Sequence, residues 1–313
     1  MKSNKKIKTN SAQAWILAAR PKTLAGAAIP VTIGMAWAMK DSHWHCFQVL
    51  PPLLCLLFAF LMQIDSNFIN DYFDFVKGND DPSSRVGPKR ACAEGWITPQ
   101  AMRQALIIVS ILACIVGLPL IYYGGWEMTI VGATCVLFAF LYTTFFSYHG
   151  MGDVLVIIFF GIIPVCFTYY VTMPINTHTI TTSVFFCSIG CGCVIDTLLC
   201  VNNFRDRIND KKDKKKTLIV KLGEKKGAQL YNIAGLFGAC VTWLSISICN
   251  TGIIIAALCL IPFLFYIYYH SRAYQKMKKI WEGRELNKVL GMTARNMLVY
   301  GLMTIIAIGI SAF

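Results

Sequence analysis

Two acidic clusters that share one pattern stand at the ends of long apolar runs. The first reads NDYFD, with Asn70, Asp71 and Asp74, and the second reads NNFRD, with Asn202 and Asp206. Residues three or four positions apart lie on one face of a helix, so each cluster predicts a stripe of carboxylate and amide oxygens. Mg2+ prefers oxygen ligands and commonly bridges one or two carboxylates to substrate phosphates. The two clusters therefore indicate a site for Mg2+ and a diphosphate.

More polar and basic residues extend both clusters. Each stripe reaches beyond its cluster, and a loop that contains Lys and Arg follows it. Because an Arg fork pairs well with phosphate oxygens, these loops would neutralise the charge of a bound diphosphate. The additional residues are Gln63, Asn67, Asp80, Asp81, Arg85, Lys89 and Arg90 around the first cluster, and Asp210 with residues 211–216 after the second.

The composition places the chain in a lipid bilayer. Hydrophobic residues make up 56% of it and charged residues 14%, and the mean hydropathy is +0.56. Crossing a hydrocarbon core takes roughly 20 helical residues. Nine continuous apolar runs approach this length, and they lack the alternation of barrel strands. We expect one all-α domain over residues 1–313, with nine transmembrane helices around a central cavity. The runs cover approximately residues 15–39, 46–68, 101–123, 126–147, 152–173, 180–203, 227–248, 252–270 and 289–311.

The distribution of Lys and Arg orients these helices. Nine crossings place only Lys40, among 29 Lys and Arg residues, on the side opposite the N-terminus. The positive-inside rule therefore predicts a cytoplasmic N-terminus and cytoplasmic long loops. The same topology accounts for most of the net charge of +13, so the basic residues are no reason to expect nucleic acid as a partner.

The depth of the polar stripes indicates what they face. An Asp near the bilayer centre costs about 2.5–3.5 kcal/mol on insertion scales, so such residues seldom face lipid. Both clusters would open on the cytoplasmic side, and we expect them to converge across one cavity. The substrate of such a cavity would be a lipid diphosphate, with its tail between the helices. Departure of diphosphate from an allylic chain would leave a carbocation, which requires a dry, aromatic-rich pocket.

Two alternatives stay open at this point. Either stripe alone is also typical of a capped, solvated helix end. A secondary transporter would likewise be polytopic and basic on the cytoplasmic side, but transporters tend to bind coupling ions near the midplane. Two clusters on one side, each beside a basic loop, favour a phosphate site over a transport path.

Cysteines and the deeper acids have other expected roles. The 13 cysteines form no CxxC pair, and we expect the densest set, Cys187, Cys191 and Cys193, to pack between helices rather than to bind metal. Asp65 and Asp196 lie deeper than the clusters. We expect each of them to pair with a neighbouring helix or to be neutral.

Several sequence strings resemble the UbiA superfamily of intramembrane prenyltransferases. They are PKTL at residues 21–24, NDYFDFVKGND at 70–80, RVGPKR at 85–90 and NNFRDRINDKKDKKKTLIVKLG at 202–223, with weaker similarity at 150–161 and 286–294. Within the superfamily they look most like the 1,4-dihydroxy-2-naphthoate polyprenyltransferases of menaquinone synthesis, enzymes of the bacterial cytoplasmic (inner) membrane. One departure is YTTFFSY at 142–148, where the family usually has a longer segment with Gly and Pro.

The resemblance implies Mg2+-dependent transfer of a polyprenyl group from polyprenyl diphosphate to 1,4-dihydroxy-2-naphthoate, with loss of CO2 and diphosphate. The product would be demethylmenaquinone. The rival acceptors are 4-hydroxybenzoate, homogentisate and haem. Carried over by position, the metal ligands would be Asn70, Asp71, Asp74, Asp80, Asn202, Asp206 and Asp210. Catalytic roles fall to Asp74, Asp206, Lys215 and Arg85, and substrate binding falls to Arg20, Lys22, Asn67, Arg90, Lys216 and Tyr142.

Overall fold

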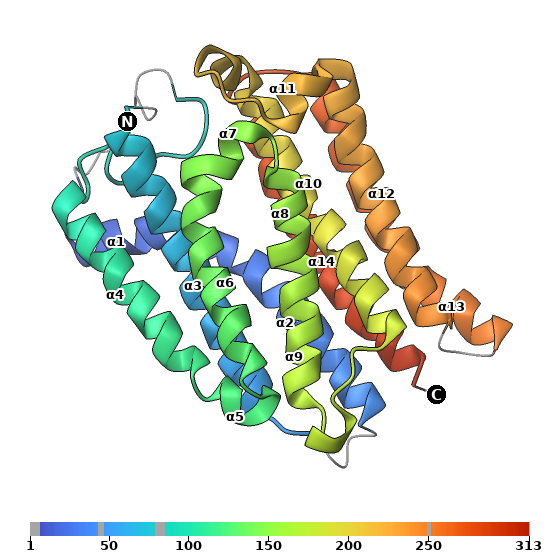
Figure 1. Cartoon of the computed structure of the whole chain (residues 1–313). Helices are drawn as coiled ribbons and strands as arrows, with labels where there is room; N and C mark the ends of the chain where they lie inside the picture. Colours follow the sequence, from blue (N-terminus) through green and yellow to red (C-terminus); the bar gives the residue numbers. More distant parts are fainter. Residues whose placement is uncertain (1–6, 43–46, 79–84, 249–251, 313) are drawn as a thin grey trace.

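The computed structural model describes residues 7–42, 47–78, 85–248 and 252–312 as a bundle of helices (Figure 1). No strand occurs in these ranges, so the all-α prediction is confirmed. Within them, eight helices are long and apolar enough to cross a membrane. They are α3 (Leu50–Val76), α4 (Pro99–Gly117), α6 to α7 (Glu127–His149), α8 to α9 (Gly152–Thr172), α10 (Thr182–Lys212), α12 (Glu224–Ile248), α13 (Ile253–Ile280) and α14 (Leu286–Ile310).

Two of the spans contain a π-helical segment, and short helices connect others. The π-helical segments are η2 (Tyr142–Phe146), between α6 and α7, and η3 (Ile158–Ile162), between α8 and α9. Segments of this kind often occur at functional sites because they change which side chains face inward. The connecting elements are α5 (Leu120–Gly124), η4 (Ile175–Thr177) and α11 (Leu218–Leu222).

The first predicted span, 15–39, is wrong in its course. The structure divides it into α1 (Ala12–Ala19), the 3-10 turn η1 (Pro21–Thr23) and α2 (Leu24–Asp41). Arg20 adopts a left-handed φ of 51° at the break, and Pro21 follows it. A residue before proline is disfavoured in the α region, so the helix ends there although the apolar run continues. At 18 residues α2 is about 27 Å long, but it is not among the eight helices above. Nine crossings therefore stay a prediction.

The two helices that carry the acidic clusters continue beyond their apolar runs. The predicted runs end near 68 and 203, whereas α3 reaches Val76 and α10 reaches Lys212. The eight further residues of α3 add about 12 Å of helix, and the nine further residues of α10 add about 14 Å. Both clusters therefore lie on regular helix that extends past the apolar part of the bundle.

The chain enters and leaves the bundle at opposite ends. The backbone N–H of Asn10 donates to the carbonyl of Trp96, 2.8 Å away, in the connection from α3 to α4. The C-terminus lies at the far end of the bundle from α7 and α11 (Figure 1). An odd number of crossings produces this arrangement. The orientation relative to the cytoplasm stays a prediction.

Glycines allow α10 to pack closely against η3. A Cβ on Gly161 would lie 2.5 Å from the Ser188 carbonyl oxygen, and one on Gly192 would lie 2.8 Å from the Ile157 backbone. Cys187 and Cys191 are fully buried on the same helix. The prediction that this cysteine-rich stretch serves helix packing is confirmed for both side chains.

We expect Gly161→Ala to lower the free energy of unfolding by about 1–3 kcal/mol, because its methyl group would overlap backbone atoms that cannot rotate away. The matched control is Gly132→Ala in α6, since nothing lies within 4 Å of a Cβ at that position. The midpoints of thermal unfolding in detergent would be compared. Equal midpoints for the two variants would show that α10 and η3 are not closely packed.

Candidate functional site

An apolar cavity of about 490 Å³ lies between α2, α3, α6 and α8 to α10. Its lining on α3 runs from Cys55 to Asn70, which corresponds to about 22 Å of helix. The cavity is thus elongated along the bundle. Such a shape accommodates a chain-like apolar group.

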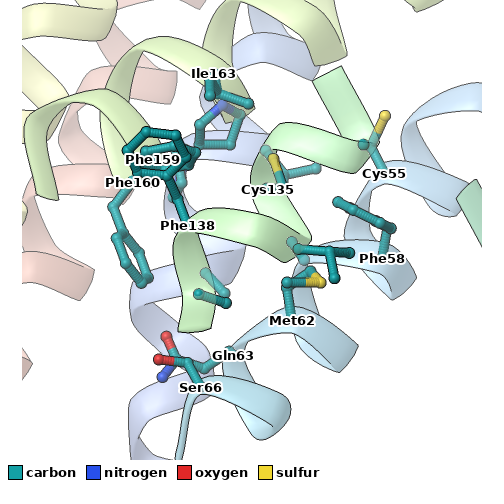
Figure 2. A pocket seen from close by; sticks show the side chains of 18 of the residues that line it. Cys55, Phe58, Met62, Gln63, Ser66, Cys135, Phe138, Phe159, Phe160 and Ile163 are labelled. Carbon is teal, nitrogen blue, oxygen red and sulfur yellow. The ribbon is translucent and has the colours of Figure 1, made fainter. Parts of the chain in front are cut away.

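The cavity has the aromatic walls that composition alone could not identify. Figure 2 shows Phe138, Phe159 and Phe160 gathered on one side, with Phe58 on another. The complete aromatic lining consists of Phe58, Phe138, Tyr142, Phe159, Phe160 and Phe167. Aromatic faces carry negative partial charge and attract cations. An apolar cavity lined by aromatic faces can therefore stabilise a reactive cation and keep water away from it.

Polar side chains from both clusters lie at one end of this cavity. Asn70 of α3 and Asn202 of α10 both line it, together with Asn67 and Tyr142. Tyr142 also interacts electrostatically with Asp153 of α8 and Asp196 of α10, and less strongly with Asp74 of α3 and Asp210 of α10. Asn70 and Asn202 thus lie on one cavity, as expected, and the convergence of the carboxylates on it stays a prediction.

Asn67 and Asn70 also hold their surroundings in place. The Asn67 amide donates to the Ala19 carbonyl at 3.1 Å and to the Thr23 hydroxyl at 3.0 Å, which fixes the break between α1 and α2. The Asn70 side-chain oxygen accepts from the Thr143 hydroxyl at 2.8 Å. The π-helical segment η2 is therefore tied directly to the first cluster.

Asp71 and Asp74 have different environments although they lie one turn apart. Both oxygens of the fully buried Asp71 accept backbone N–H groups, from Ala91 at 2.9 Å and Cys92 at 3.0 Å. The Arg20 guanidinium is 3.7 Å from the same carboxylate. Asp74 instead pairs with Arg90 at 3.1 Å, at the mouth of the site. Asp71 therefore holds the loop at Ala91 and Cys92, whereas Asp74 makes a side-chain ion pair and its binding of metal stays a prediction.

The second cluster is joined to the loop of the first by Arg205. Its guanidinium forms a two-pronged pair with the carboxylate of Asp206, at 2.8 and 2.6 Å, and donates to Asn287 of α14 at 2.9 Å. Asn287 in turn donates to the Val86 carbonyl at 3.1 Å. A Cβ on Gly87 would lie 2.7 Å from the end of the Arg205 side chain, so the loop packs directly against this guanidinium. Arg205 and Asn287 were not among the predicted site residues, although Arg205 stands inside the NNFRD string.

A second connection between the two halves runs through Tyr148. The Lys77 ammonium, just after α3, lies 4.7 Å from the centre of its ring, and the Lys215 ammonium, after α10, lies 5.2 Å from it. The backbone N–H of Lys216 donates to the Tyr148 carbonyl at 3.0 Å. Basic side chains from both loops are thus gathered over one aromatic ring. Lys77 and Tyr148 were not among the predicted site residues.

The remaining predicted residues differ in their placement. Asp80 lies outside the described residues. The Arg85 guanidinium donates to the Pro88 carbonyl at 2.7 Å, within the same loop. Asp210 is buried near Asp206, whereas Lys22 and Lys216 are exposed. Lys22 is therefore accessible to a soluble acceptor or to a lipid head group.

The donor set of the site fits Mg2+. Asn70 and Asn202 line the cavity. The carboxylates of Asp74 and Asp210 interact electrostatically with Tyr142 of the same lining, and Asp206 interacts with Asp210. These are hard oxygen ligands, and they come from two helices with space between them.

The deep Asp65 behaves as expected. Its carboxylate accepts the Ser110 hydroxyl of α4 at 2.6 Å, so the predicted pairing with a neighbouring helix is confirmed.

We expect Asp71→Leu to lower the free energy of unfolding by about 1–3 kcal/mol, because the N–H groups of Ala91 and Cys92 would lose their acceptor. Limited proteolysis at Lys89 and Arg90 should accelerate. The exposed Asp213, replaced in Asp213→Leu, is the matched control. A stable, protease-resistant Asp71→Leu that no longer binds Mg2+ would instead assign Asp71 to the metal.

Comparison with known proteins places the chain in a family. It matches the UbiA prenyltransferase family over residues 27–285. It is 37% identical to the 1,4-dihydroxy-2-naphthoate octaprenyltransferase of Escherichia coli over 238 residues, 73% of this chain and 74% of the relative. The enzyme of the same description from Mycobacterium tuberculosis is 32% identical, over 92% of this chain and 94% of the relative.

Solved structures share the fold. A UbiA homolog from Archaeoglobus fulgidus, bound to DMAPP and Mg2+, aligns with a TM-score of 0.59 and 16% identity, over 93% of this chain and 98% of that one. A UbiA homolog from Aeropyrum pernix aligns with a TM-score of 0.64 and 11% identity, over 90% and 97%. The predicted family and its multi-pass helical architecture are confirmed. This chain belongs to the UbiA prenyltransferase family.

Proposed function

We propose that the protein transfers a polyprenyl group from polyprenyl diphosphate to 1,4-dihydroxy-2-naphthoate in the bacterial cytoplasmic membrane. The reaction would release CO2 and diphosphate and form demethylmenaquinone. One observation carries the proposal: Asn70 and Asn202, from two distant parts of the chain that each carry an acidic cluster, line the same elongated apolar cavity. The naphthoate enzymes among its relatives support the acceptor.

Two sets of residues would bind the diphosphate, one through Mg2+ and the other by direct contact with phosphate oxygens. Asp74, Asp206 and Asp210 would hold Mg2+, with Asn70 and Asn202 as further oxygen donors. Bound Mg2+ would supply positive charge that neutralises the diphosphate as it leaves. Arg85, Arg90, Lys215 and Lys216 would contact the outer phosphate oxygens.

The cavity would protect the prenyl group after diphosphate departs. Its apolar walls exclude water, which would otherwise capture an allylic cation. The faces of Phe138, Phe159 and Phe160 would stabilise the positive charge until the aromatic ring attacks. The ring carbon that bears the carboxylate would form the new C–C bond and then lose CO2, which restores aromaticity.

The acceptor carboxylate would bind near the start of α2. Lys22 is exposed there, whereas Arg20 is already 3.7 Å from Asp71. We therefore favour Lys22 over Arg20 for this contact. Tyr142, at the boundary between the polar end and the apolar walls, would border the ring. A prenyltransferase for 4-hydroxybenzoate is the alternative, because its acceptor also carries a carboxylate.

Purified protein supplied with Mg2+, a short prenyl diphosphate and a panel of aromatic acids tests the proposal. We expect mass spectrometry to find a product from 1,4-dihydroxy-2-naphthoate that has gained the prenyl group and lost CO2. Chelation of Mg2+ should abolish it, and Asp206→Asn should reduce turnover by roughly 10²- to 10³-fold. Asp213→Asn, beyond the cluster, is the control with unchanged turnover. Product from 4-hydroxybenzoate alone, with the carboxylate retained, would contradict the assignment.

A further inference from the structure

Three buried side chains outside the proposed diphosphate site form a compact group. Asp153 of α8 lies next to Asp196 and Cys200, which are one turn apart on α10. Ligand atoms from the three residues lie within 4.8 Å of one another. The exposed fractions are 6% for Asp153, 3% for Asp196 and 0% for Cys200. The group is therefore shielded from bulk water on all sides.

The carboxylates in this group are not satisfied by the protein. The Cys200 thiol is 3.4 Å from one oxygen of Asp196 and 4.0 Å from one oxygen of Asp153. The other oxygen of each carboxylate, Asp153 Oδ2 and Asp196 Oδ1, is buried without a hydrogen-bond partner. No Lys or Arg in the described part of the chain forms an ion pair with either acid. Two ionised carboxylates this close in a medium of low dielectric are unfavourable unless a bound cation or a proton neutralises them.

The backbone holds the group at this spacing. Gly192 packs so closely on Ile157 that a Cβ would come within 2.8 Å of its backbone, and Gly161 is similarly close to Ser188. These contacts fix α10 against α8 and η3 on the apolar side of the group. The three ligands are therefore held in place by rigid helices rather than by a loop, as a metal site requires.

We propose that Asp153, Asp196 and Cys200 form a second metal site, which binds one thiophilic divalent cation of the Zn2+ class. A thiolate ligand disfavours Mg2+ and suits Zn2+, which commonly takes three protein ligands and one further ligand in a tetrahedral arrangement. The divalent charge would offset the two carboxylates. The donor chemistry thus differs from that of the Asp-rich clusters, where every protein ligand is an oxygen.

This second site would lie directly behind the wall of the cavity. Asp153 follows Gly152, where a Cβ would be 3.5 Å from the Tyr142 hydroxyl and 3.3 Å from Leu199. Tyr142 and Leu199 both line the cavity. A bound cation would hold α8 to α10 behind Tyr142, and it would not itself meet the prenyl diphosphate.

Metal binding by the purified full-length protein tests the proposal. The protein is stripped with a chelator and titrated with Zn2+ or Co2+ in excess Mg2+, which occupies the oxygen sites. We expect roughly one Zn2+ per chain, since a preformed site with three ligands binds without rearrangement. With Co2+, we expect the thiolate-to-metal charge-transfer absorption that a cysteine ligand produces. The Asp-rich clusters contain no cysteine and cannot give this absorption.

Single-residue variants distinguish metal binding at this site from metal binding by other cysteines. Cys200→Ser and Asp196→Asn should weaken Zn2+ binding by at least about 10- to 100-fold, and Cys200→Ser should remove the Co2+ absorption. Cys187→Ser, fully buried on the same helix and outside the group, is the matched control and should change neither. Wild-type protein that shows no Co2+–thiolate absorption would overturn the proposal without any variant. A single proton shared by the carboxylates of Asp153 and Asp196 would then explain how the two buried acids lie so close together.

Discussion

Negative charge beside hydrocarbon has to be compensated, and this requirement organises the end of the bundle that carries the two acidic clusters. Each acid of the two clusters that could face lipid instead meets a cation or a backbone donor. Asp74 pairs with Arg90, Asp206 pairs with Arg205, and Asp71 accepts two backbone N–H groups. The same compensation brings the loop after α3 against α10 and α14. The contacts that neutralise the acidic clusters are therefore the same contacts that bring the loop after α3, α10 and α14 together at the site.

The connections between the halves explain how two helices can act together although a cavity separates them. Arg205 and Asn287 connect α10 and α14 to the loop at Val86, and Tyr148 collects Lys77 and Lys215. None of these contacts fills the cavity. Because they join the segments that carry the two clusters, they set the separation of these clusters without occupying the apolar cavity.

The sequence predicted the parts of this arrangement that depend on local pattern. Apolar runs of sufficient length indicate membrane helices, and the spacing of Asn70, Asp74, Asn202 and Asp206 indicates polar stripes. The break at Arg20 was missed because the apolar run continues across it, although Pro21 marks it. The role of Asp71 depends on backbone groups at Ala91 and Cys92, about twenty residues away, and no pattern of side chains reports that contact. Asp196 was expected to pair with a neighbouring helix or to be neutral, but its grouping with Asp153 and Cys200 was not predicted, since the three meet only when α8 packs on α10.

The central claim is that both clusters form one diphosphate site, and calorimetric binding of a prenyl diphosphate in Mg2+ tests it most directly. Wild-type protein, Asp74→Asn, Asp206→Asn and the double variant would be compared. One shared site predicts one bound molecule per chain, a loss of at least about tenfold in each single variant, and a coupling energy above about 0.5 kcal/mol between them. Two bound molecules per chain, or losses in the single variants that add in the double variant, would contradict the account.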